Sequence, residues 1–237
     1  MRDLKWKRVL LKLSGEALVG DGSYGISPEM IKSLALDLKS VFELNIQLCI
    51  VIGGGNIYRG LSGAARGMDR TTGDYMGMLA TVMNSLALQN ALEEINVQTR
   101  VQSALPISAV CEPYIRRKAF RHLEKKRVVI FAAGTGNPFF STDTAASLRA
   151  SELNCSVIVK ATKVNGIYDK DPVNNKNAKI YKKISYSDVI NKDLKVMDTT
   201  SISLAKESKI PILITNIFKK NSIINALNAK GIYSIIK

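Results

Sequence analysis

The sequence predicts an α/β fold, a three-layer sandwich in which a mostly parallel central sheet carries helices on both faces. Three observations support this prediction. Short, strongly apolar runs alternate along the chain with segments whose apolar residues recur at helical spacing. Several of these runs end in glycine or lysine, as buried parallel strands often do beside a ligand. No linker or internal repeat interrupts the pattern, so we expect residues 1–237 to form one domain.

Five apolar runs are predicted to be buried strands because they are short and rich in valine, isoleucine and leucine. They cover residues 8–13, 48–52, 127–132, 156–161 and 210–215. Between the first two runs, residues 14–18 are expected to form a short loop or first turn. The glycine-rich segment 20–25 is expected to be turn-rich.

The predicted helices lie between these strands. Ser27 and Pro28 are typical of an N-cap and a first helical residue, and they precede a helix over residues 30–44. Its apolar residues are spaced to share one face: Ile31, Leu34, Leu38 and Val41. Further helices are expected over residues 81–91, 143–152 and 203–209.

Four polar or glycine-rich segments lie at the predicted strand ends. They are Lys12, Gly53 to Gly55, Gly134 to Gly136 and Lys160 to Lys163. Because the carboxyl ends of parallel strands meet at one edge of the sheet, these distant segments should converge there. Ligands of such sheets bind at that edge.

Composition excludes several classes of protein. No apolar stretch is long enough to span a bilayer, and residues 1–8 do not resemble a signal peptide. The three cysteines are scattered, which argues against a disulfide framework or a zinc site, and we expect a cytoplasmic protein. The formal charge of +14 would attract polyanions, but the basic residues look spread along the chain and aromatic residues make up only 6%. We therefore do not expect nucleic-acid binding, and the charge is either functional or a drift in composition.

Residues 53–60 read Gly-Gly-Gly-Asn-Ile-Tyr-Arg-Gly and directly follow a predicted strand. Glycines leave backbone N–H groups open to an anion, and Arg59 adds a forked donor suited to phosphate oxygens. A tight turn beside a solvated arginine would give the same pattern. The chain lacks both the P-loop motif and the Gly-x-Gly-x-x-Gly fingerprint.

The remaining candidate residues suit phosphoryl transfer, which needs positioning and cations more than covalent chemistry. Lys12 could lie over phosphates, or simply cap a sheet edge. Asp74 could bind ribose hydroxyls or begin a helix, and Asp198 could hold lysines or begin a helix. Asp171 precedes proline, where a turn is the common role. The single histidine, His122, is interpreted as a surface residue rather than a catalyst, and the sequence shows no metal cluster.

Together, five segments resemble the bacterial uridylate kinases, a branch of the amino acid kinase superfamily. The Gly-Thr-Gly-Asn-Pro-Phe-Phe block that begins at residue 134 is the most specific of them, and aspartate, acetylglutamate and carbamate kinases lack it. The resemblance extends over nearly the whole chain. The five segments are residues 12–18, 53–60, 67–84, 134–143 and 160–168.

The resemblance implies an ATP-dependent UMP kinase of pyrimidine nucleotide biosynthesis, with Mg²⁺ bound mainly by phosphates and water. The implied catalytic residues are Lys12, Arg59, Lys163 and Asp198, with Lys12, Lys163 and Asp198 forming a charged cluster. The implied ATP-binding residues are Lys12, Leu13, Ser14, Gly15, Gly55, Arg59, Thr162, Asn165, Tyr168 and Asp171.

The implied UMP-binding residues are Gly54, Asp74, Thr135, Gly136, Asn137, Pro138, Phe139, Phe140, Ser141 and Thr142. The resemblance also implies a homohexamer, activation by GTP and inhibition by UTP. The activator segment would comprise Gly20, Asp21, Gly22, Ser23, Tyr24 and Gly25, which match the family pattern only in part.

Two alternatives stay open at this point. The chain could phosphorylate a carboxylate or a carbamate, as other members of the superfamily do. It could also be a nucleotide sensor or nucleic-acid binder without catalysis. The two phenylalanines in residues 134–142 argue against the first alternative, and the presence of Lys12 and Asp198 argues against the second.

Overall fold

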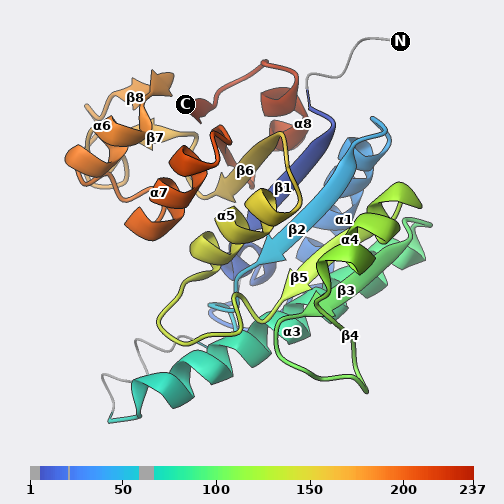
Figure 1. The fold of residues 1–237 in the computed structure, drawn as a ribbon. Coiled ribbons are helices and arrows are strands. Elements are labelled where there is room, and N and C mark those ends of the chain that lie inside the picture. Colours follow the sequence, from blue (N-terminus) through green and yellow to red (C-terminus); the bar gives the residue numbers. More distant parts are fainter. Residues whose placement is uncertain (1–5, 21, 59–66) are drawn as a thin grey trace.

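The computed structural model describes residues 6–20, 22–58 and 67–237 (Figure 1). Its centre is a nine-stranded sheet with the order β4-β3-β5-β2-β1-β6-β10-β11-β9. The strands are β1 (Arg8–Leu13), β2 (Gln47–Ile52), β3 (Thr99–Ser103), β4 (Glu112–Pro113), β5 (Val128–Ala132), β6 (Val157–Thr162), β9 (Lys183–Ile184), β10 (Ile212–Asn216) and β11 (Ser234–Ile236). A separate two-stranded sheet joins β7 (Ile167–Tyr168) to β8 (Ile180–Tyr181).

The sheet is mostly parallel, as predicted. Every pairing from β4 across to β10 is parallel, and β10 pairs with β11 antiparallel. In this register Lys12 of β1 lies directly beside Lys160 of β6. The carboxyl ends of the central strands therefore meet at one edge, where parallel sheets bind ligands.

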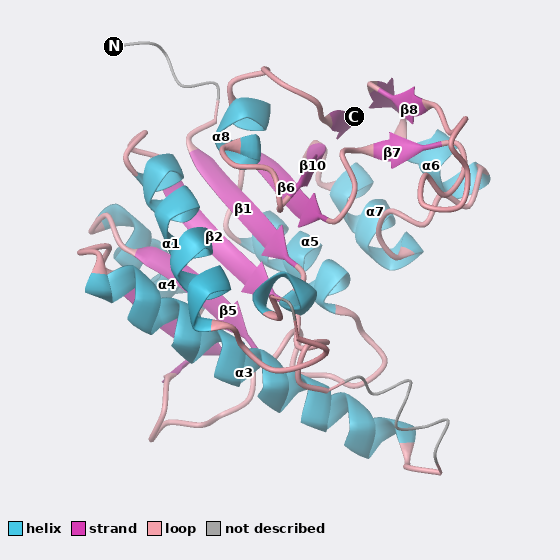
Figure 2. Cartoon of the chain, turned by 180° about the vertical axis from the view of Figure 1, so that it is seen from behind, coloured by secondary structure: helices cyan, strands magenta, loops and turns pink. Residues whose placement is uncertain are grey.

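Helices cover both faces of the sheet, which completes the predicted three layers. One face carries α1 (Pro28–Phe42), α3 (Arg70–Glu94) and α8 (Ser222–Leu227), which lie in front of the sheet in Figure 2. The other face carries α4 (Arg116–Glu124), α5 (Thr142–Glu152), α6 (Tyr186–Asn191) and α7 (Thr199–Glu207). Alternation along the strands separates the two cores: Leu11 faces the first layer, whereas Leu10 faces the second.

The five strands expected from the sequence are the five central ones, β5, β2, β1, β6 and β10. The strands that sequence reasoning missed lie at the edges or in the small sheet, and most have only two or three residues. β3 was missed for a different reason, because it buries the polar residues Thr99, Gln102 and Ser103 and has no apolar pattern. The predicted helix over 81–91 is the middle of the 25-residue α3.

The predicted start of α1 is confirmed. The Ser27 hydroxyl accepts a hydrogen bond from the backbone N–H of Met30 at 3.3 Å, and Pro28 is the first helical residue. Such a cap satisfies one of the donors left open at a helix start. A 3-10 turn, η1 (Gly15–Leu18), forms where a loop or first turn was expected.

The interpretation of His122 as a surface residue is wrong. Its side chain is 13% exposed, and its Nε2 lies 3.0 Å from Oε2 of Glu112. Its Nδ1 lies 3.2 Å from Nη1 of Arg127, so β4 and α4 are joined through the ring. Burial raises the pKa of Glu112, but the hydrogen bonds from His122 and Gln102 and the nearby positive charge together outweigh it and leave that pKa below its usual value.

The basic residues are also less evenly spread than the sequence suggested. Residues 116–127 hold seven arginines and lysines against the single acid Glu124, and most of them are exposed along α4 and the turn after it. Within the described residues, no helix is both long and apolar enough to cross a membrane.

Candidate active site

Two glycine loops meet at the carboxyl edge of the sheet, one after β1 and one after β2. A Cβ added to Gly15 would lie 2.4 Å from Oδ1 of Asn56 and 2.6 Å from the carbonyl oxygen of Gly53. A Cβ added to Gly54 would lie 2.7 Å from the carbonyl oxygen of Gly77 in α3. Both positions need glycine because the backbones approach too closely for a side chain. The loop after β2 is therefore held between η1 and α3.

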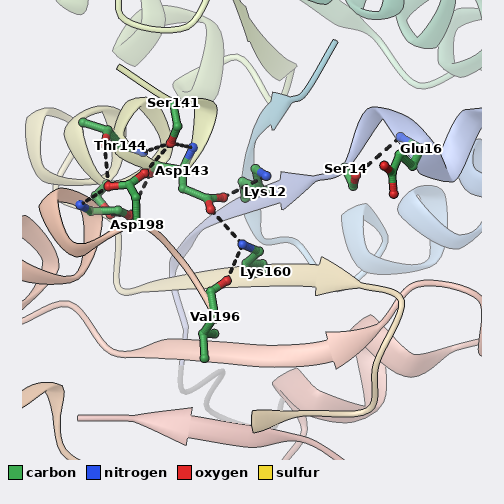
Figure 3. A network of polar contacts seen from close by, with 11 residues as sticks. Lys12, Ser14, Glu16, Ser141, Asp143, Thr144, Lys160, Val196 and Asp198 are labelled. Carbon is green, nitrogen blue, oxygen red and sulfur yellow. Dashed lines mark hydrogen bonds and ion pairs between the residues drawn. The ribbon is translucent and has the colours of Figure 1, made fainter. Parts of the chain in front are cut away.

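Beside these loops a buried carboxylate bridges two lysines, as Figure 3 shows. The Nζ of Lys12 lies 2.8 Å from Oδ1 of Asp143, and the Nζ of Lys160 lies 2.8 Å from Oδ2. The three side chains are at most 14% exposed. Lys160 also donates to the carbonyl oxygen of Val196. Two like charges at facing positions in adjacent strands repel each other, and Asp143 compensates for them from the start of α5.

The charges of this triad shift its pKa values in opposing ways. Burial raises the pKa of Asp143, but Lys12 and Lys160 outweigh burial and hold that pKa below its usual value. Burial lowers the pKa of Lys160, and the attraction of Asp143 offsets this only in part. With both lysines protonated, the triad carries one net positive charge at the edge of the sheet.

No direct ion pair joins the three described residues expected to form the charged cluster, although the charge of Asp198 opposes the lowering of the Lys160 pKa by burial. Asp198 is the N-cap of α7, and its carboxylate accepts hydrogen bonds from Thr144 Oγ1 at 2.9 Å and from the Ser201 backbone N–H at 2.7 Å. It also accepts one from the hydroxyl of Ser141. Asp198 therefore fixes the beginning of α5, which carries Asp143, and contacts neither Lys12 nor Lys163 directly.

Lys163 points elsewhere. Its Nζ lies 2.6 Å from Oε2 of Glu16, and its side chain is 60% exposed. This ion pair lies over η1 rather than within the buried triad. It borders a hollow of about 420 Å³ that is also lined by Gly20, Gly22, Ser23, Gly55 and Asn56. The expected donor-side glycine, Gly55, thus shares one hollow with three of the six residues of the expected activator segment, while Asp21 and Arg59 lie outside the described residues.

A second hollow, of about 160 Å³, brings together six of the residues expected to bind UMP. Glycines of α3, Gly73 and Gly77, form its floor with Met78 and Thr81. The six expected residues that line it are Gly54, Asp74, Thr135, Phe140, Ser141 and Thr142. We call it the acceptor hollow.

Asp74 lies inside α3 and not at its start, since the N-cap is Asp69. Arg70 Nε lies 2.8 Å from Oδ2 of Asp74, which also accepts the backbone N–H of Phe139 at 2.8 Å. Asp74 therefore ties α3 to the 134–142 loop. Four of the loop residues expected to bind UMP do not line the acceptor hollow: Gly136, Asn137, Pro138 and Phe139.

A third hollow, of about 540 Å³, lies beside the small sheet. Thr162, Tyr168 and Asp171 line it together with residues 192–196, and we call it the donor hollow. Asn165 does not line it; its Oδ1 accepts a hydrogen bond from Nδ2 of Asn216 at 3.2 Å. Leu13 ends β1 and Ser14 is the N-cap of η1, so both follow Lys12 directly along the chain.

The model of the amino acid kinase family matches residues 7–216 of this sequence. The chain belongs to the amino acid kinase family. The uridylate kinase of Rickettsia conorii is 56% identical over 234 residues, which cover 99% of this chain and 97% of the relative. That of Rickettsia prowazekii is 57% identical over 233 residues, covering 98% and 96%.

Solved structures of the same family match the fold over almost the whole chain. A crystal structure of UMP kinase from Ureaplasma parvum has a TM-score of 0.93 at 39% identity, covering 98% of each chain. The UMP kinase structure from Bacillus anthracis has a TM-score of 0.94 at 37% identity, covering 98% of this chain and 96% of the other. The predicted fold class is confirmed.

Sequence reasoning missed Asp143, the acid at the centre of the buried triad. Asp143 was assigned only to the start of a helix, and Lys160 only to a strand end. One signal could have revealed them. Each lysine interrupts an apolar run, Val-Leu-Leu-Lys-Leu in β1 and Val-Ile-Val-Lys-Ala in β6, and a lysine on a buried face requires an acidic partner nearby.

Proposed function

We propose that this chain transfers the γ-phosphoryl group of ATP to UMP, giving ADP and UDP. The observation that carries the proposal is the position of the Lys12–Asp143–Lys160 triad, because Thr142 of the acceptor hollow immediately precedes Asp143. The acceptor hollow combines a glycine, a carboxylate and an aromatic side chain: Gly54, Asp74 and Phe140. That set suits a phosphate, a ribose and a base. The curated relatives named uridylate kinase support the same substrate.

In this reaction a phosphate oxygen of UMP attacks the γ-phosphorus of ATP in line and displaces ADP. The attacking oxygen is already anionic, so no strong base is needed. The protein has to hold two anions together and neutralise the oxygens of the transferred group. The net positive charge of the triad serves that purpose, and Asp143 keeps both ammonium groups in place. Asp198 acts through Ser141 and Thr144 by fixing the start of α5.

ATP would occupy the donor hollow with its adenosine end and extend its phosphates toward Ser14 and Gly15. Tyr168 offers an aromatic plane for adenine, and Thr162 and Asp171 offer polar contacts. The phosphates would then lie near the separate hollow of about 420 Å³, which Gly55 and Lys163 line. In this arrangement Lys163 is an exposed cation that would exchange its contact with Glu16 for one with the phosphates, unlike the buried Lys12.

Mg²⁺ fits this site as a companion of ATP. Among the described residues, no three histidine, cysteine, aspartate or glutamate side chains gather as a metal site. Both oxygens of Asp143 are already paired with lysines. The phosphates and water would therefore supply most of the ligands, as Mg²⁺ prefers, and the ion would neutralise phosphate charge.

We further propose a cytoplasmic homohexamer that responds to GTP and UTP, as the family resemblance implies. An exposed apolar stripe on α3 supports contact between copies, since Tyr75, Met76, Leu79 and Met83 all lie at least 38% exposed on one helix. The hollow lined by Gly20, Gly22 and Ser23 offers an effector a place beside Lys163.

A coupled ADP-release assay across UMP, CMP, dUMP, aspartate and carbamate tests the reaction. We expect turnover with UMP and little with the two non-nucleotide acceptors. Turnover with carbamate but not UMP would replace the proposal with a carbamate kinase. Binding of DNA that weakens steeply with salt, without any turnover, would instead favour a nucleic-acid binder.

A further inference from the structure

We propose that a buried pair of asparagines, Asn56 and Asn84, positions the nucleotide-binding loops of this enzyme. The two amides face each other in reciprocal hydrogen bonds. Asn56 Nδ2 donates to Asn84 Oδ1 at 2.9 Å, and Asn84 Nδ2 donates to Asn56 Oδ1 at 2.7 Å. The residues are 3% and 0% exposed. Neither side chain was among the candidate residues of the sequence, and neither contacts the Lys12–Asp143–Lys160 triad.

The second N–H of each amide holds a different loop. Asn84 Nδ2 also donates to the carbonyl oxygen of Gly53 at 2.7 Å, and Asn56 Nδ2 donates to that of Gly25 at 2.8 Å. The backbone of Asn56 completes the second contact, because its carbonyl oxygen accepts the N–H of Gly25 at 2.8 Å. All four side-chain N–H groups of the pair are therefore used, with none left for water or substrate.

Asn56 also contacts the donor loop. Its Oδ1 lies where a Cβ on Gly15 would be only 2.4 Å away, so the amide packs against the bare backbone of that residue. Asn56, itself part of the loop after β2, thus touches the segment after β1 and the end of the 20–25 segment, and Asn84 holds the Gly53 carbonyl of the same loop. Asn84 anchors all three to α3, a single rigid helix.

These contacts orient the groups that face the substrates. A peptide bond is planar, so a fixed Gly53 carbonyl also fixes the N–H of Gly54 on the opposite side of the same plane. Gly54 lines the acceptor hollow, and Gly55, the next residue, lines the hollow of about 420 Å³ beside Lys163. One turn earlier on α3, Thr81 Oγ1 accepts the N–H of Ala133 at 2.7 Å, which ties the same helix to the 134–142 loop.

The inference rests on the proposed function only for its turnover measurements. The variants are Asn84→Ala, Asn56→Ala and the double variant, with Asn90→Ala as the matched control. Asn90 is on α3 as well, but its exposed amide only donates to Glu94. Calorimetric binding of ATP and of UMP, each without the other, is measured beside the steady-state constants.

Each single variant should raise the KM and Kd of both nucleotides roughly tenfold, the equivalent of one or two net hydrogen bonds. The double variant should lose little more than either single one, because the pair acts as a unit. A residue that served only folding would lower kcat through a smaller active fraction and leave KM and Kd unchanged. Circular dichroism melting identifies the temperature range in which every variant is folded.

Unchanged Kd values in folded Asn84→Ala and Asn56→Ala proteins would overturn the inference, as would additive losses in the double variant. Failure of the proposed function has a different signature. In that case the wild-type protein itself does not turn over UMP. The ATP-binding measurement then still decides whether the asparagine pair positions the donor loop.

Discussion

The buried triad and the exposed pair of Lys163 with Glu16 contain ion pairs of nearly equal length in very different surroundings. The N–O distances are 2.8 Å in the triad and 2.6 Å in the exposed pair. The triad side chains are at most 14% exposed, whereas Lys163 is 60% exposed. Distance alone therefore says little about the role of a charge. The triad holds its positive charge in a buried position, whereas the exposed pair holds Lys163 in contact with solvent.

The largest expected effect is on catalysis through Lys12. Lys12→Ala removes a preorganised ammonium group and should cut kcat by about 10²–10³-fold, the usual cost of losing one such charge or donor. The coupled assay measures this directly. Lys163→Ala, tested in parallel, should lower kcat much less, because its side chain is exposed to solvent and already paired with Glu16. An equal loss in both variants would contradict the distinction between buried and exposed lysines.

The next effect is on folding through Asp143. Asp143→Ala leaves Lys12 and Lys160 side by side and partly buried without their counter-ion, which should cost about 3–5 kcal/mol of unfolding free energy. Urea denaturation at neutral pH gives this number. The control is Glu16→Ala, where loss of a surface pair should cost no more than about 1 kcal/mol.

Acid should weaken the triad in a defined direction. The pKa of Asp143 lies below its usual value in the folded protein, so the unfolded chain takes up the proton first. The carboxylate therefore stabilises the fold above about pH 4, the unperturbed value, and that contribution is lost as the pH falls through the lower folded pKa. Asp143→Asn should flatten this part of the stability curve. The measurement is the melting temperature of the wild-type and Asp143→Asn proteins from about pH 2 to about pH 6, the range in which carboxylates titrate.

Asp74 offers an intermediate case, since its partner Arg70 is 38% exposed while Asp74 itself is 15% exposed. Asp74→Asn should weaken UMP binding about tenfold, because it loses one charge-assisted acceptor, and should change ATP binding little. Separate calorimetric titrations with the two nucleotides distinguish these effects. A change confined to ATP would move Asp74 from the acceptor side to the donor side.

The smallest expected effect is the salt response of the exposed pair. Lys163→Ala should change the unfolding free energy by less than about 0.5 kcal/mol, and added salt should remove even that. The same salt series on the wild-type triad should change little, because partly buried charges are less screened. Equal salt sensitivity of Lys12 and Lys163 variants would show that exposure does not separate the two regions.

Much of the fold was predictable because its central strands carry strong local signals. The continuous apolar runs of β1, β2, β5, β6 and β10 reflect burial on both faces, which any sequence must meet with apolar side chains. The two-residue strands at the edges have no such requirement. β3 buries the polar side chains Thr99, Gln102 and Ser103, which hydrogen bond to Val97, Glu112 and Leu105. Its sequence therefore lacks the apolar run that marks the central strands.

The candidate site was predictable where the backbone itself is the functional group. Gly15 and Gly54 have no room for a side chain, and that restriction is visible in the sequence as glycine. Residues that act through a partner were harder to assign. Asp198 was expected either to hold lysines or to begin a helix, and the sequence could not decide between these roles. Its carboxylate caps α7 and accepts from Ser141 and Thr144.

The sequence by itself determined the layered α/β fold, the glycine loops at the strand ends and the likeness to a kinase family. These features depend on the spacing of apolar residues and on glycines where backbones approach closely. Both can be recognised from residues that are close together in the sequence. Only the tertiary structure decided which charges meet. Asp143 bridges Lys12 and Lys160 because β1 and β6 pair in register beneath α5, and Asn56 meets Asn84 because α3 packs on the loop after β2. Such pairings depend on strand order and helix placement. The paired residues are 28 or more positions apart, so the sequence does not show that they will meet.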